Sequence, residues 1–126
     1  MTPAVQHHML VDSLRLVAAP PEAQVSALPD FVCLTCEIST LYTDAYLLVP
    51  QLEEARLITA EAGAALRRLD AFFREMPEDI ECFDGSSLPT HSFWAEARRL
   101  AADALVALGE DIAPPDLTHV SWVAGG

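Results

Sequence analysis

The stretch Thr59-Ala-Glu-Ala-Gly-Ala-Ala-Leu-Arg-Arg-Leu-Asp-Ala-Phe-Phe-Arg-Glu-Met76 carries the clearest helix signal in the chain. Thr59 is a residue type that caps helix starts, and Pro77 directly after the stretch cannot continue a helix. The apolar side chains recur every three or four positions, at Ala62, Leu66, Leu69, Phe72, Phe73 and Met76. This spacing predicts an amphipathic helix that buries one face against other helices.

Helical spacing also occurs on both sides of this stretch. It predicts further helices over residues 2–19, 21–27, 35–49 and 90–108. Pro50 either kinks the helix before it or opens a short helix through Ala55. Residues 77–89 are expected to form a loop. We therefore expect an all-α fold, a compact bundle of four to five helices in one domain over residues 1–126, with residues 110–126 as an extended C-terminal tail packed against it.

The two strongest helical patterns also predict the core. Their inward positions are Leu66, Leu69, Phe72, Phe73, Trp94, Leu100 and Leu105.

Length and composition narrow the class of protein. The chain has 126 residues, of which 52% are hydrophobic and 21% charged. A chain of this kind is too apolar to be disordered, and it is long enough to fold without disulfides or a metal. It contains no 18-residue apolar run and no basic leader, and its three cysteines are an odd number. We expect a cytoplasmic protein with no membrane segment.

The charge is strongly negative and unevenly distributed. Nineteen acidic residues oppose seven arginines, lysine is absent, and the formal net charge is −12. Residues 22–54 contain six acids and no base, and residues 75–84 contain five acids and no base. This balance argues against binding nucleic-acid phosphates, which requires a basic surface. The acids either keep the protein soluble or form an electrostatic docking surface for a basic partner.

Cys33-Leu-Thr-Cys36 is the motif closest to known enzyme chemistry. A helix start near Thr35 would favour a thiolate, but the acids Asp30 and Glu37 oppose it. No histidine follows the second cysteine as in helical peroxidases, and no βαβ pattern surrounds the pair. We interpret the cysteines as small buried apolar residues, with a thiol-dependent redox enzyme as the alternative.

No metal, cofactor or catalytic residue is expected. His7 and His8 are adjacent and point to different helix faces, while Cys82, His91 and His119 are isolated in sequence. The acids of residues 79–85 do not match calcium-loop spacing, and neither a Gly-x-Ser-x-Gly elbow nor a Gly-rich phosphate loop is present. Two arginine pairs could hold an anion, but nearby acids compete for them: Arg67-Arg68 and Arg98-Arg99.

Several short motifs together resemble a group of small bacterial proteins. The motifs are Leu28-Pro-Asp-Phe-Val32, Glu37-Ile38, Asp44-Ala-Tyr46, Leu57-Ile58, Leu66-x-x-Leu-Asp70, an acidic loop, and the Trp94-x-x-Ala-Arg-x-Leu-Ala101 helix. This combination resembles small acidic all-helical bacterial proteins of uncharacterised type, some of which look like immunity partners of secreted toxins. The resemblance implies an immunity or antitoxin-like inhibitor of a basic toxin, and not an enzyme.

A binding function of this kind would use acids that have no arginine nearby in sequence. The predicted partner-binding residues are Glu37, Asp44, Glu78, Asp79, Glu81 and Asp84, with Phe83 or Trp122 as an aromatic anchor. The acidic composition is also compatible with an acidic adaptor or nucleic-acid mimic, and with a domain whose charge only confers solubility.

Overall fold

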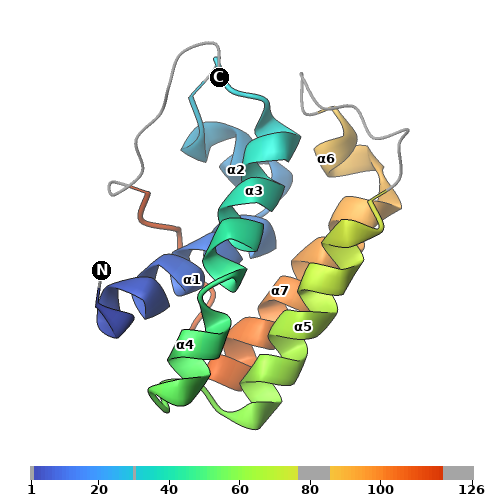
Figure 1. Ribbon diagram of the computed structural model, residues 1–126. Helices are drawn as coiled ribbons and strands as arrows, with labels where there is room; N and C mark the ends of the chain where they lie inside the picture. Colours follow the sequence, from blue (N-terminus) through green and yellow to red (C-terminus); the bar gives the residue numbers. More distant parts are fainter. Residues whose placement is uncertain (1, 30, 77–85, 118–126) are drawn as a thin grey trace.

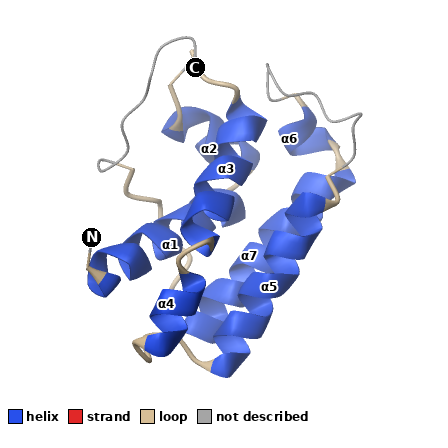
Figure 2. Cartoon of the chain, viewed as in Figure 1, coloured by secondary structure: helices blue, strands red, loops and turns tan. Residues whose placement is uncertain are grey.

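Every regular element in the computed structural model is a helix within the residues it describes, 2–29, 31–76 and 86–117 (Figure 2). The helices are α1 (Pro3–Ala18), α2 (Pro21–Ala27), α3 (Leu34–Tyr46), α4 (Val49–Glu54), α5 (Ala60–Arg74), α6 (Ser87–Thr90) and α7 (Ser92–Leu108). The predicted all-α class is confirmed. Among these described helices, none has the combination of length and hydrophobicity needed to cross a bilayer.

The helix ends follow the local sequence signals. The Thr2 hydroxyl accepts a hydrogen bond from the Val5 amide at 3.3 Å, and the Thr59 hydroxyl accepts one from the Ala62 amide at 3.1 Å. Both contacts satisfy amides that lack a partner in the first turn of a helix. At the C-terminal end of α7, Gly109 adopts a φ of 74°, the left-handed conformation that terminates the helix.

Four long helices build the core. α1 packs against α3 and α7, and α5 lies alongside α7 (Figure 1). Of the predicted core residues, Leu66, Leu69, Trp94 and Leu105 are fully buried, and Phe73 is nearly so. The prediction is wrong for Phe72 and Leu100, which are only partly buried at the core edge.

Two hydrogen bonds secure large aromatic side chains inside this core. The Tyr42 hydroxyl donates to the Leu66 carbonyl at 2.6 Å, which joins α3 to α5. The Trp94 indole donates to the Ser87 hydroxyl at 3.1 Å, which joins α7 to α6. Neither aromatic therefore buries a polar group without a partner.

Two predicted boundaries were wrong. The helix expected over residues 35–49 ends at Tyr46. Of the two alternatives for Pro50, the short helix is confirmed: α4 carries Pro50 in its first turn and ends at Glu54. The helix expected from Thr90 begins at Ser92, because the His91 ring nitrogen Nδ1 accepts the Phe93 amide at 3.0 Å and caps a new helix. Residues 87–90 form α6, partly within the segment expected to be a loop.

The segment after α7 contains no helix or strand over its described residues, 110–117, and runs against α1. Arg15 on α1 donates to the Asp111 carbonyl at 3.2 Å and pairs with the carboxylates of Asp111 and Glu110 at 2.7 and 3.4 Å. Leu117 packs against the edge of the core. The predicted extended tail is thus confirmed for these residues, and residues 118–126 lie outside the described part.

Candidate functional site

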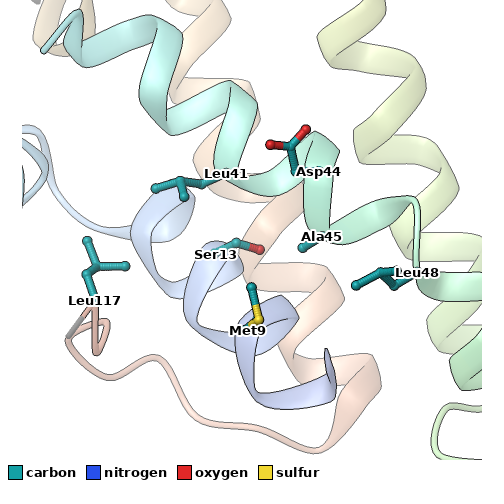
Figure 3. Close-up of a pocket in the computed structure, with 7 residues that line it drawn as sticks. All are labelled: Met9, Ser13, Leu41, Asp44, Ala45, Leu48 and Leu117. Carbon is teal, nitrogen blue, oxygen red and sulfur yellow. The ribbon is translucent and has the colours of Figure 1, made fainter. Parts of the chain in front are cut away.

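An apolar groove opens between α1, α3 and the tail (Figure 3). Its volume is about 320 Å³. It is lined by Met9, Ser13, Leu41, Asp44, Ala45, Leu48 and Leu117.

The groove is a product of helical spacing on two neighbouring helices. Met9 and Ser13 are four residues apart on α1, so they lie on one face of that helix. Leu41 and Ala45 hold the same relation on α3, and Leu48 follows that helix. The Ser13 hydroxyl donates to the Leu10 carbonyl at 2.7 Å, so its hydrogen is already used within α1. The lining thus offers apolar contact and almost no polar recognition.

Asp44 is the one charged residue among those that line the groove. It is exposed, and Figure 3 shows its carboxylate pointing away from Met9 and Leu117. Glu37 is half-buried and lies seven residues earlier on α3, on nearly the same side of the helix. Neither carboxylate makes a salt bridge with a described residue. Both charges are therefore available to a basic group from outside.

Four of the five arginines on α5 and α7 are engaged elsewhere. Arg67 lies 3.8 Å from the Glu53 carboxylate, Arg74 lies 2.8 Å from that of Asp70, and Arg99 pairs with Glu96 and Asp103. Arg98 donates to the Leu88 carbonyl. These contacts disfavour the anion site considered for the arginine pairs, because acids or a carbonyl already contact Arg67, Arg98 and Arg99.

The structure brings together two of the predicted partner-binding residues, Glu37 and Asp44, on α3. The rest of that set lies outside the described residues: Glu78, Asp79, Glu81, Phe83, Asp84 and the alternative anchor Trp122. Sequence reasoning missed the apolar lining of the groove. The sequence signal that could have indicated it is the apolar stripe of α1, which extends to Val5 and Met9. In the structure these two side chains are not fully buried: Val5 is 47% exposed and Met9 is half-buried.

The two described cysteines lie at the start of α3. Cys33 is the N-cap residue, half-buried, with its Sγ 3.9 Å from the Thr35 hydroxyl oxygen. Cys36 is exposed, so the interpretation of both as buried apolar residues is wrong for Cys36. Cys33 thus lies at a helix N-terminus, a position that many reactive cysteines occupy. However, the described residues contain no strand that could form a thioredoxin-like βαβ unit.

A polar cluster of His8, Asp12 and Asp116 joins α1 to the tail. His8 Nε2 lies 3.0 Å from Asp12 Oδ2 and 4.0 Å from Asp116 Oδ2. Sequence reasoning considered His7 with His8 and missed this group. The His8/Asp12 pair has the i,i+4 spacing that a helix brings together, but Asp116 is 104 residues further along the chain than Asp12.

Comparisons with protein-family models, with curated proteins and with solved structures found no match. The groove and the polar cluster are therefore the basis on which a function is assigned.

Proposed function

We propose that this chain is a protein-binding module that docks a basic protein through the groove between α1 and α3. The observation that carries the proposal is an open apolar groove with an unpaired, exposed carboxylate, Asp44, at its edge. Apolar side chains usually supply most of the affinity of a protein interface, while charges at its rim guide association and select the partner.

The occupant is an apolar side chain with an arginine or lysine beside it in the partner. The apolar group would contact Met9, Leu41 and Leu48, and the basic group would pair with Asp44. Glu37 lies about 10 Å further along the axis of α3, since each helical residue rises about 1.5 Å. It could receive a second basic residue. A small polar ligand fits less well, because such sites usually present several converging polar groups and this lining does not.

The negative charge of the whole chain supports a basic partner. A net charge of −12 attracts cationic surfaces over distances of about 10 Å at ordinary ionic strength. The acidic segment that contains Glu78, Asp79, Glu81 and Asp84 would add to this attraction, with Phe83 as a further anchor. A nucleic-acid mimic would need carboxylates in phosphate-like rows and no apolar anchor, so the groove favours a protein-docking role.

The resemblance to immunity proteins suggests the type of partner. In that setting the partner is a basic toxin, and the module inhibits it by covering its active surface. This role requires no catalytic group in the module itself.

The docking proposal is tested with a random peptide library displayed on phage and selected against the purified full chain. We expect the enriched peptides to place arginine or lysine next to leucine, phenylalanine or tryptophan. A synthetic copy of an enriched peptide should lose about tenfold in affinity with Asp44→Lys, since a like charge then faces its basic residue. Leu48→Gln should also weaken binding by removing apolar contact.

Glu75→Lys is the matched control. It makes the same change of charge at an exposed site at the end of α5, a helix that does not line the groove. Enrichment of neutral or acidic peptides, or equal loss of affinity with Asp44→Lys and Glu75→Lys, would contradict the proposal.

The second candidate is a thiol-dependent redox enzyme, favoured by the position of Cys33 at the N-terminus of α3. It predicts that the full chain catalyses reduction of insulin disulfides by dithiothreitol and that Cys33→Ser abolishes the activity. The docking proposal predicts a background rate for both proteins.

A further inference from the structure

The cluster of His8, Asp12 and Asp116 gathers three groups that commonly bind metal ions. One atom from each lies within 4.8 Å of the other two. Two of the residues come from one face of α1, and the third comes from the tail after α7. The tail position is fixed independently of the side chain of Asp116, because its backbone amide donates to Asp12 Oδ1 at 3.1 Å.

The two oxygens of Asp12 have different environments. Oδ1 accepts the Asp116 amide and lies 3.7 Å from the Arg15 guanidinium. Oδ2 is buried and has no hydrogen-bond partner in the described structure, although His8 Nε2 lies 3.0 Å away. The His8 contact is within ion-pair distance, but its geometry is not that of a hydrogen bond. A residue that is only 1% exposed therefore directs an unsatisfied carboxylate oxygen at an imidazole nitrogen.

We propose that His8 Nε2, Asp12 Oδ2 and Asp116 Oδ2 form a binding site for Zn²⁺. A buried carboxylate oxygen without a hydrogen bond is costly, and a cation between it and the histidine removes that cost. In a tetrahedral Zn²⁺ site, metal–ligand distances of about 2.0–2.2 Å place the ligand atoms about 3.3–3.6 Å from one another. The observed separations of 3.0 and 4.0 Å lie on either side of this range, so shifts of a few tenths of an ångström in the two exposed side chains would complete the geometry.

The ligand chemistry selects Zn²⁺ over the hard cations. One imidazole nitrogen with two carboxylate oxygens suits Zn²⁺, whereas Ca²⁺ takes six to eight oxygen ligands and Mg²⁺ prefers an oxygen octahedron. The side chains of His8 and Asp116 are both more than half exposed, so water can complete the coordination shell.

A protonated His8 is the competing occupant of the same space, because it too would neutralise the two carboxylates. Arg15 is a second positive group, but it faces Asp12 Oδ1 and leaves the Oδ2 side to the metal. Since His8 must be neutral to bind Zn²⁺, affinity for the metal should fall as the pH is lowered. If the three residues form only an ion pair, we expect no Zn²⁺ binding at any pH.

The site would link the beginning of the fold to its tail. Asp12 and Asp116 are 104 residues apart, and Leu117, which directly follows Asp116, lines the docking groove. Bound Zn²⁺ would therefore fix that wall of the groove. The metal site itself does not depend on the docking proposal.

The test is a calorimetric titration of ZnCl₂ into the full chain after chelator treatment and buffer exchange. We expect one Zn²⁺ per chain and an upward shift of the unfolding temperature. His8→Gln and Asp116→Asn should each weaken binding about tenfold or more, because each removes one of three ligands. His7→Gln is the matched control, since it removes a neighbouring histidine that is not in the cluster, and it should leave the affinity unchanged. Circular dichroism verifies that each variant is folded.

Co²⁺ substitution separates this site from a cysteine site. The Co²⁺-loaded chain should show no sulfur-to-cobalt charge-transfer band, because the proposed ligands are nitrogen and oxygen. No Zn²⁺ binding at millimolar concentration, binding that survives both His8→Gln and Asp116→Asn, or a charge-transfer band from sulfur would each overturn the proposal.

Discussion

Removing one oxygen atom from Tyr42 probes the contact between α3 and α5. The residue is fully buried, and its hydroxyl donates to the Leu66 carbonyl at 2.6 Å. Its ring lies 5.8 Å from that of Phe73 and 6.1 Å from that of Tyr46, measured between centroids. Tyr42→Phe keeps these ring contacts and deletes only the hydrogen bond.

The expected cost at neutral pH is about 1 kcal/mol of unfolding free energy, the usual net value of one buried hydrogen bond. The Leu66 carbonyl does not become an orphan, since a carbonyl inside a helix also accepts the amide four residues later. For a chain of this length, the loss corresponds to a fall of about 3–6 °C in the unfolding temperature.

The alkaline side of the stability curve gives a second, independent expectation. Burial, and to a smaller extent the negative charges of Asp70 and Tyr46, raise the pKa of Tyr42 above its ordinary value. Above about pH 10 the unfolded chain therefore loses a proton that the folded chain retains, and stability falls by about 1.4 kcal/mol per pH unit. Tyr42→Phe lacks this loss, so it should become more stable than the natural chain near pH 10.5–11.

Urea unfolding followed by circular dichroism measures both effects at pH 7 and at several values from 9 to 11. Tyr46→Phe is the control at pH 7, because Tyr46 is only half-buried and makes no hydroxyl hydrogen bond of this kind to a described residue. It does not serve above pH 9, because burial raises the pKa of Tyr46 as well. Two results would refute the reasoning. One is equal stability of Tyr42→Phe and the natural chain at pH 7; the other is a variant whose deficit in unfolding free energy increases above pH 10.

Three further predictions concern the core, α5 and the acidic segment. Leu69→Ala is expected to cost about 2–5 kcal/mol, because the side chain is fully buried; a neutral result in thermal melts would contradict its place in the core. Gly63→Ala is expected to stabilise the fold by about 0.5–1 kcal/mol, because alanine has the higher helix propensity. The new methyl group would lie 3.1 Å from the carboxylate end of Glu53, a flexible side chain that can move away. Destabilisation in urea titrations would show that Glu53 cannot move away. Once a basic partner is identified, a triple charge reversal to lysine in the acidic segment should slow association and leave fold stability unchanged. Stopped flow should also show a weaker salt dependence of the association rate between about 50 and 500 mM. Unaltered rates would mean that this charge serves solubility alone. The reversed residues are Glu78, Asp79 and Glu81.

The fold was largely predictable because its signals are local. Long helical repeats predict the main helices, and the Thr59 cap at the start of α5 was expected from residue type. The division between α6 and α7 was not predicted, because histidine is an unusual capping residue and its ring acts through a specific orientation. The partial burial of Phe72 depends on which helices lie beside it, and periodicity contains no such information.

The candidate sites were less predictable for the same reason. Asp44 could be selected from sequence, since it lacks a neighbouring arginine, but the groove beside it exists only when α1, α3 and the tail are assembled. The cluster of His8, Asp12 and Asp116 joins residues from both ends of the described chain. Sequence spacing reveals contacts within one helix and is silent about contacts between distant segments.

The packing of α1 against α7 has a consequence for synthesis in the cell. Leu10, Leu14 and Leu16 of α1 are fully buried, and α7 is one of the two helices that α1 contacts most extensively. About 90 residues separate the end of α1 from the end of α7. At a translation rate of roughly 5–20 residues per second, the part of α1 that faces α7 waits about 5–18 seconds before α7 is complete, although α3 is made earlier. During that interval the nascent chain is a natural client for chaperones that bind exposed leucine-rich segments.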